Sequence, residues 1–285
     1  MKMLFKDGKR KAVTLSYDDG VVQDIRLIDI MNKYGLKGTF NLNSGKFTPE
    51  ECETVTKPTG TTNDRLKLSE AAALYKNSGH EIAVHGLEHL KLINFTAPEI
   101  TYEISADRVN LEKEFGTIVN GMAYAYGTYN DSVIDSIKKC GIVYSRTVLQ
   151  TEKFRLPENW ISWHPTCHHN HPALMELAKK FIEVPLSEQT CELSVFYLWG
   201  HSYEFDRDNN WNVIEEFSEY IGKREDIWYA TNKEIYDYVT AYKRLELSMN
   251  SKIAYNPTNL TLWARVNGTV CEIKPGETVE FRVDK

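Results

Sequence analysis

The stretch Ala12-Val13-Thr14-Leu15-Ser16-Tyr17-Asp18-Asp19-Gly20 places two adjacent carboxylates at the end of an apolar run. The run predicts a buried β-strand, because Val, Leu and Tyr suit a covered, pleated surface. Asp18 and Asp19 would only repel each other there unless a cation is bound or one of them titrates differently from the other. Gly20 allows a sharp turn, so that both side chains can face one point. The stretch therefore predicts a charged site at the carboxyl end of a strand.

A second signal, His85-Gly-Leu-Glu-His89, also follows an apolar strand. Two imidazoles four residues apart can point the same way if a helical turn follows the strand. Two neutral imidazoles and one carboxylate, with water completing the set, are the ligands of a catalytic zinc ion. One histidine could instead cap a helix while the other makes a hydrogen bond in the core. Together with the acidic pair, the histidine pair predicts a metal-dependent hydrolytic site.

The composition argues against several classes of protein. The chain has 285 residues and a formal net charge of −6, which argues against nucleic acid or an anionic membrane as a partner. No apolar stretch approaches the roughly 20 residues that span a bilayer, and the amino terminus lacks the apolar core of a secretory signal. Five scattered cysteines, an odd number, fit a reducing compartment better than a disulfide framework. We therefore expect a cytoplasmic protein, of undetermined oligomeric state.

Strand-like and helix-like stretches alternate along residues 12–247, which is typical of βα units that form a parallel sheet. Polar residues 43–68 predict a long surface loop of the kind that often forms the rim of a site. The predicted strands are 12–17, 37–42, 81–84, 122–126, 143–148, 161–167 and 193–199, and the predicted helices are 21–34, 69–77, 96–115, 131–139, 172–182, 211–222 and 233–247.

The character of the sequence changes after Leu247. Asn-Pro, Asn-Gly and Pro-Gly turns separate short apolar runs, which predicts small antiparallel strands at 253–255, 260–266, 269–273 and 278–283. We therefore predict two parts, a (β/α) domain in residues 1–248 and a small β appendage with a structural role in residues 249–285.

Four motifs, in order along residues 12–205, make the chain similar to a known family. Ser16-Tyr-Asp-Asp-Gly20 resembles the Thr-Phe-Asp-Asp-Gly signature of polysaccharide deacetylases, carbohydrate esterases of the chitooligosaccharide deacetylase type. His85-x-x-x-His89 resembles their His-Ser/Thr-x-x-His signature, with Gly86 in place of the hydroxyl residue. Ala123-Tyr-Ala-Tyr-Gly127 resembles Arg-x-Pro-Tyr-Gly, and Leu198-Trp-Gly-His201 resembles a one-residue-longer Leu-x-His.

This resemblance implies a distorted (β/α) barrel with its site at the carboxyl ends of the strands. It also implies one divalent metal ion bound by Asp19, His85 and His89. Zinc is the first candidate for the ion, with cobalt, nickel or manganese as alternatives.

The resemblance also assigns the catalytic roles. Asp18 is expected to be the general base and His201 the general acid, and the backbone N–H of Tyr126 is expected to help hold the oxyanion. The implied reaction removes an N- or O-linked acetyl group from a sugar, oligosaccharide or polysaccharide.

Two departures from the family pattern affect these expectations. Ala123 stands where the third signature has an arginine that orients the base, so the sequence leaves open what holds Asp18. The fourth, Asp-x-x-Asp-Trp signature is not clear, and Trp163, or Trp160 beside it, is the nearest candidate for its aromatic wall. Trp163, Trp199 and Tyr126 are the predicted substrate contacts, although core packing is an equally good explanation for the tryptophans.

Three alternatives remain open from the sequence. His85-x-x-Glu88-His89 also matches a zinc peptidase pattern in which the glutamate is the base. The second alternative is a non-catalytic carbohydrate-binding protein, because the orienting arginine is missing. The third is hydrolysis of a small cyclic amide on the same fold, since relatives of the family act on such substrates.

A further histidine-rich segment lacks the paired spacing of a structural zinc site, and we expect it to form a polar loop or a substrate rim rather than a second metal site. It contains His164, Cys167, His168, His169 and His171.

Overall fold

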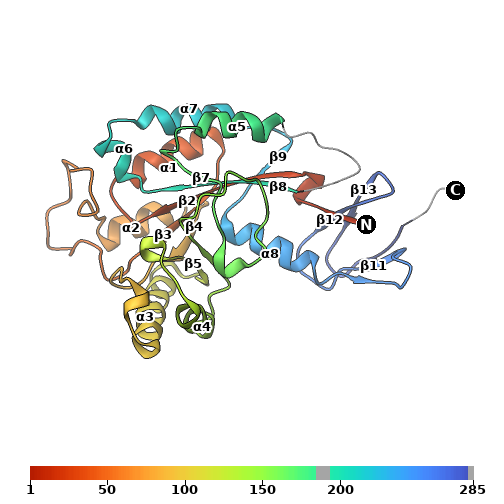
Figure 1. Ribbon diagram of the computed structural model, residues 1–285, viewed down its shortest axis with the longest axis horizontal. Helices are drawn as coiled ribbons and strands as arrows, with labels where there is room; N and C mark the ends of the chain where they lie inside the picture. The colour runs from red at the N-terminus through yellow and green to blue at the C-terminus, as the bar shows by residue number, and fades with distance from the viewer. Residues whose placement is uncertain (184–192, 282–285) are drawn as a thin grey trace.

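The computed structural model describes residues 1–183 and 193–281. Eight parallel strands form one sheet in the order β6-β5-β4-β3-β2-β8-β7, and β9 pairs with the first residues of β2. The sheet curls into a distorted (β/α) barrel with β6 and β7 at its edges (Figure 1). The strands are β2 (Lys11–Asp18), β3 (Gly38–Leu42), β4 (Glu81–Val84), β5 (Gly121–Ala123), β6 (Tyr144–Arg146), β7 (Cys167–His168), β8 (Ser194–Gly200) and β9 (Ile227–Tyr229).

Helices surround this curled sheet on its outside (Figure 1). Figure 1 shows α1, α5 and α7 along one side and α3 and α4 along the opposite side. The helices are α1 (Asp24–Tyr34), α2 (Leu68–Tyr75), α3 (Ala97–Phe115), α4 (Asp131–Lys139), α5 (Leu174–Glu183), α6 (Tyr203–Arg207), α7 (Trp211–Ile221) and α8 (Asn232–Tyr242). Among the described residues, none of these helices is long and apolar enough to cross a membrane.

The strand β2 lies in the middle of the core, as its composition predicts. All eight of its residues are buried, and it pairs in parallel with β3, β8 and β9. The predicted helix at 96–115 is also confirmed, because the Thr96 and Glu99 side chains form a reciprocal capping box and Gly116 ends the helix in the left-handed region at φ 65°.

The last part of the chain forms two small antiparallel sheets, as predicted. One contains β1 (Lys2–Leu4), β12 (Leu262–Val266) and β13 (Thr269–Ile273), and the other contains β10 (Glu246–Leu247), β11 (Ile253–Tyr255) and β14 (Thr278–Glu280). The amino-terminal strand β1 thus joins this region of the structure, which the sequence did not predict. Residues 282 and 283, the end of the last predicted strand, lie outside the described residues. The division into two domains stays a prediction.

Several predicted elements are wrong in extent. The strand predicted at 122–126 ends at Ala123 and is followed by a 3₁₀ turn at Ala125–Gly127. The strand predicted at 161–167 is a 3₁₀ turn at Trp160–Ser162 followed by the two-residue strand β7, because the Asn159 side chain accepts a hydrogen bond from the Ile161 N–H at 3.1 Å and Pro165 has no N–H to pair. The helix predicted to reach residue 247 ends at Tyr242, and the chain then forms β10. The four described cysteines are free thiols, and Cys191 lies outside the described residues.

Candidate active site

A cavity of 1120 Å³ opens at the carboxyl ends of the central strands. Asp18, Asp19, His85 and His201 lie in its wall, at the ends of β2, β4 and β8. The predicted loop at 43–68 supplies much of the rim, which confirms its predicted place. Its residues at the cavity are Gly45, Lys46, Phe47, Thr48, Pro49, Thr62, Asn63 and Arg65.

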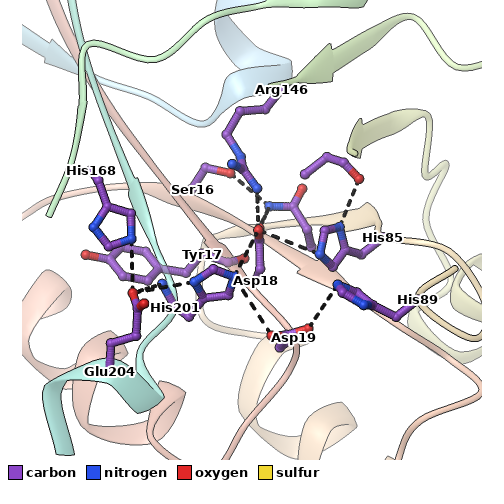
Figure 2. Close-up of polar contacts among 12 residues, drawn as sticks. Ser16, Tyr17, Asp18, Asp19, His85, His89, Arg146, His168, His201 and Glu204 are labelled. Carbon is purple, nitrogen blue, oxygen red and sulfur yellow. Dashed lines mark hydrogen bonds and ion pairs between the residues drawn. The ribbon is translucent and has the colours of Figure 1, made fainter. Parts of the chain in front are cut away.

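Asp18 is a buried carboxylate, 2% exposed, with two fixed donors. Its Oδ1 accepts a hydrogen bond from the Asn41 side chain at 2.8 Å, and its Oδ2 pairs with the guanidinium of Arg146, at the end of β6 (Figure 2). Burial alone would raise the pKa of Asp18, but the charges of Arg146, His85 and His201 outweigh burial and lower this pKa to about 2. Asp18 is therefore ionised and held in one orientation.

Arg146 supplies the cation that orients Asp18, which the sequence left unassigned because Ala123 stands at the arginine position. The guanidinium of Arg146 is fully buried and lies over the Trp199 ring, 4.5 Å from its centroid, as it reaches Asp18. Ala123 acts through its backbone, because its carbonyl accepts a hydrogen bond from Nδ1 of His85 at 2.8 Å. The orienting cation is thus present, but it comes from the next strand of the sheet.

Asp19, His85 and His89 converge on one point. One ligand atom from each lies within 4.8 Å of the others. The contact of His85 Nδ1 with a carbonyl places the ring proton on Nδ1, which leaves Nε2 with a free lone pair toward the carboxylates. Burial lowers the pKa of both histidines, that of His89 to about 4, so both are neutral near pH 7. The donor set fits a divalent ion, because neutral imidazole and ionised carboxylate are the ligand forms.

Asp19 also has a cation of its own. Its Oδ1 lies 3.0 Å from Nη2 of Arg65 and 3.8 Å from Nε2 of His89. Burial alone would raise the pKa of Asp19, but the charge of Arg65 and those of the surrounding histidines outweigh it and lower the pKa. Each of the two adjacent carboxylates is therefore balanced by one arginine, which explains how both can be buried and ionised side by side.

The segment from His85 to His89 is an irregular loop and not a helix. Gly86 adopts φ +87° and His89 φ 56°, and these two left-handed residues fold the chain so that the imidazole centroids lie 4.8 Å apart. The buried Asp107 side chain accepts the His85 backbone N–H at 3.1 Å and fixes the start of the loop. Glu88 pairs with Lys46 of the rim at 3.5 Å. The helical arrangement of a His-x-x-Glu-His peptidase is therefore not formed.

His201 lies between the aspartates and a third carboxylate. Its Nε2 is 3.8 Å from Asp18 Oδ2, and its Nδ1 is 3.4 Å from Oε2 of Glu204, on helix α6 (Figure 2). Burial lowers the pKa of His201, but the carboxylates of Glu204, Asp18 and Asp19 outweigh burial and raise this pKa above its ordinary value. This arrangement favours an imidazolium whose Nε2 proton faces the cavity.

The predicted substrate contacts lie in two different places. Tyr126 is 61% exposed at the cavity, at φ 59°, with its ring edge-to-face against His89 at 4.7 Å. Trp199 also lines the cavity. Trp163 is 1% exposed and packs against Trp160, Tyr144 and Tyr197, away from the cavity lining. Its ring belongs to the core and does not line the cavity, so Trp163 is not placed to contact a substrate there.

Residues 5–145 match the family model described as polysaccharide deacetylase. The chain belongs to the polysaccharide deacetylase family. Its structure is similar to that of a protein from Mycobacterium smegmatis assigned as a polysaccharide deacetylase, with 16% identity, a TM-score of 0.59, and coverage of 85% of this chain and 94% of that one. It is also similar to the Xyl-CE4 domain of a multidomain xylanase from the hindgut metagenome of Trinervitermes trinervoides, with 15% identity, a TM-score of 0.52, and coverage of 82% and 92%. At such identities these structures support the fold alone, and no curated protein matches the chain.

Sequence reasoning missed several residues of this deacetylase-family site. Arg146 gave one usable signal, because a charged residue inside a predicted buried strand needs a partner. Asn41 gave a similar signal inside β3. Glu204 and Arg65 lie in a short helix and a polar loop, where charged residues are ordinary, so nothing in the sequence singles them out.

Proposed function

We propose that this protein is a metal-dependent deacetylase that removes N- or O-linked acetyl groups from a sugar, oligosaccharide or polysaccharide. The observation that carries this proposal is the placement of Asp18, ionised and immobile, between the Asp19–His85–His89 group and His201. A base, a metal-ligand set and an acid thus share one cavity wall, as hydrolysis of an acyl group requires.

Asp19, His85 and His89 would hold the ion, which supplies Lewis-acid polarisation of the acetyl carbonyl and acidifies the attacking water. Asp18 takes the proton from that water. A carboxylate with a pKa of about 2 is a weak base, so it needs a water more acidic than bulk water.

His201 donates a proton to the departing amine or hydroxyl. Its Nε2 faces Asp18, whereas its Nδ1 faces Glu204, which stabilises the protonated ring. The backbone N–H of Tyr126 stabilises the oxyanion from the left-handed turn that follows β5.

The cavity supports a carbohydrate substrate larger than one small molecule. Its volume of 1120 Å³ exceeds the roughly 300–1,000 Å³ of typical small-molecule pockets. Tyr126, Trp199 and Tyr203 line it and offer aromatic faces beside polar groups, a combination that suits sugar rings. The reading as a non-catalytic binding protein loses its main support, since Arg146 replaces the missing arginine.

The test combines metal analysis with acetate release from a panel of N- and O-acetylated oligosaccharides, with a small cyclic amide included. We expect about one tightly bound divalent ion per chain and release of acetate. His89→Ala should lose this ion and the activity, whereas the control Glu88→Gln, at the exposed neighbour, should keep both. Full occupancy of the tight site in His89→Ala, or acetate release from metal-free protein, would contradict the proposal. Loss of activity in Glu88→Gln with the ion retained would favour the peptidase assignment.

A further inference from the structure

Three imidazole nitrogens surround one carboxylate oxygen behind His201. Oε2 of Glu204 lies 3.0 Å from Nε2 of His168, 3.3 Å from Nε2 of His169 and 3.4 Å from Nδ1 of His201. The backbone N–H of His201 also donates to this oxygen at 3.2 Å. Figure 2 shows His168 and His201 converging on the same carboxylate oxygen of Glu204.

This arrangement holds more donors than the oxygen can accept. A carboxylate oxygen offers about two lone-pair sites, and the His168 ring and the His201 amide suffice to fill them. Among the described residues, neither ring nitrogen of His169 nor Nδ1 of His201 has a hydrogen-bond partner. His169 is fully buried, so a ring nitrogen without a partner there carries an uncompensated desolvation cost. Because buried polar groups are almost always paired, the His169 imidazole is expected to contact a water molecule or an ion.

We propose that His168, His201 and Glu204 form a second divalent-metal site, with His169 available as a fourth ligand. One ligand atom from each of the first three lies within 4.8 Å of the others. In a tetrahedral site with bonds of about 2.0–2.2 Å, ligand atoms lie about 3.3–3.6 Å apart. The separations from Glu204 of 3.3 and 3.4 Å fall in this range, and that of 3.0 Å lies just below it. Imidazole ligands with one carboxylate favour zinc over magnesium or calcium, which prefer oxygen ligands.

The second site is expected to bind its ion more weakly than the first. Nδ1 of His168 accepts the exposed Asn170 backbone N–H at 3.1 Å, so the ring proton lies on Nε2 in the metal-free molecule. An ion on Nε2 requires this proton to move to Nδ1 and the Asn170 N–H to turn to water. In the first site, by contrast, the Ala123 carbonyl already holds the proton of His85 on Nδ1.

Occupancy of the second site inhibits the enzyme, a consequence that rests on the proposed function. An ion on Nδ1 of His201 replaces the proton that this nitrogen carries in the imidazolium. The proton left on Nε2 then belongs to a metal-bound neutral imidazole, which is a weaker acid than an imidazolium. The ion also occupies Glu204, the carboxylate that stabilises the protonated ring. A divalent ion bound at Asp19 therefore activates the enzyme, whereas a second ion of the same metal bound at Glu204 inhibits it.

The first test counts ions on the full chain. Chelator-treated protein is titrated with zinc, and the bound ions are measured by calorimetry and elemental analysis. We expect two ions per chain for the wild type, one tight and one weaker, and only the tight one for His168→Ala. Because the His168 side chain is partly exposed, its truncation should leave the fold intact, and the conservative His168→Gln serves as a second variant. The control is His171→Ala in the same segment, whose ring contacts Glu152 instead at 3.4 Å, and it should retain two ions.

The second test measures acetate release against zinc concentration. The wild-type rate should rise to one equivalent and then fall at least tenfold in excess zinc, whereas His168→Ala should keep its rate in the same excess. A wild type with a single zinc ion, or a second ion retained by both His168 variants, overturns the second site and leaves the proposed function intact. Absence of the tight ion from the wild type would instead overturn the proposed function.

Discussion

Asp18 at the end of β2 and Asp24 at the start of α1 are buried carboxylates six residues apart. The surroundings of Asp18 hold a buried guanidinium, and its pKa is about 2. Within residues 1–183 and 193–281, the side chain of Asp24 accepts hydrogen bonds from two hydroxyls, those of Tyr75 and Ser202, each at 2.5 Å. Burial raises the pKa of Asp24, and the two hydroxyls do not offset it, so this pKa is about 7.

The difference teaches that burial alone does not decide whether a carboxylate in this fold is charged. An apolar environment penalises the ionised form of both residues, and at Asp18 the fixed cation of Arg146 reverses the outcome. Asp18, with Arg146, is suited to accept a proton in a reaction. Asp24 ties α1 to α2 and to the segment after β8, and it needs no charge for that purpose.

The sharpest test of this comparison exchanges each aspartate for asparagine. Both substitutions are nearly isosteric, so folding should survive them. We expect Asp18→Asn to lower acetate release by roughly 10²–10⁴-fold with the tight metal ion still bound, because a general base is lost. Asp24→Asn should stay within about tenfold of the wild type, a difference of about 1.4 kcal/mol in the barrier. Equal losses in the two variants would break the comparison, since both carboxylates would then be needed for structure alone.

The second prediction concerns a variant that removes the Arg146 cation and leaves the negative charge of Asp18. Arg146→Met should reduce the free energy of unfolding of the metal-free protein by about 3–5 kcal/mol at pH 7, because Asp18 would be a buried charge without its partner. The double variant Arg146→Met/Asp18→Asn should recover much of that loss. Urea denaturation of the single and double variants measures this coupling. If the double variant is no more stable than Arg146→Met, the loss reflects the packing of Arg146 on Trp199 rather than an orphaned charge.

The sequence predicted the parts of the site that adjoin each other along the chain. Asp18 and Asp19 follow a strongly apolar strand, and His85 and His89 follow another, so local patterns place all four at the carboxyl ends of strands. The two strands are β2 and β4, which lie on either side of β3 in the sheet. His201 was found through its family motif. These placements depend on the period and burial of single strands, which residues close in sequence largely determine.

The partners of these residues could not be predicted in the same way. Arg146 reaches Asp18 across 128 positions of the sequence, and only the order of strands in the sheet brings them together. The role of Glu204 follows only from the structure, in which the five-residue helix α6 places it beside His201. Trp163 shows the opposite error, because an aromatic residue reads the same in the sequence whether it lines a cavity or fills a core.

The third prediction concerns the pH dependence of stability, and Asp24 carries it. Its pKa rises from the usual 3.8 to about 7 in the folded protein, so between these values the folded state binds more protons than the unfolded state. The free energy of unfolding therefore falls as the pH rises through this window, by at most about 4 kcal/mol at 1.36 kcal/mol per pKa unit. Asp18 acts with the opposite sign, because its lowered pKa stabilises the fold above pH 4 and this stabilisation is lost only toward pH 2.

Asp24→Asn should remove the loss near neutrality, because asparagine can accept one hydroxyl proton and donate to the other hydroxyl without ever ionising. We expect the variant to match the wild type near pH 4.5 and to exceed it by about 1–4 kcal/mol at pH 8, in urea denaturation of metal-free protein. A variant that is less stable than the wild type at pH 8 would show that the folded state does not raise the pKa of Asp24. The contrast with Asp18 would then lie in hydrogen-bond number rather than in the presence of a cation.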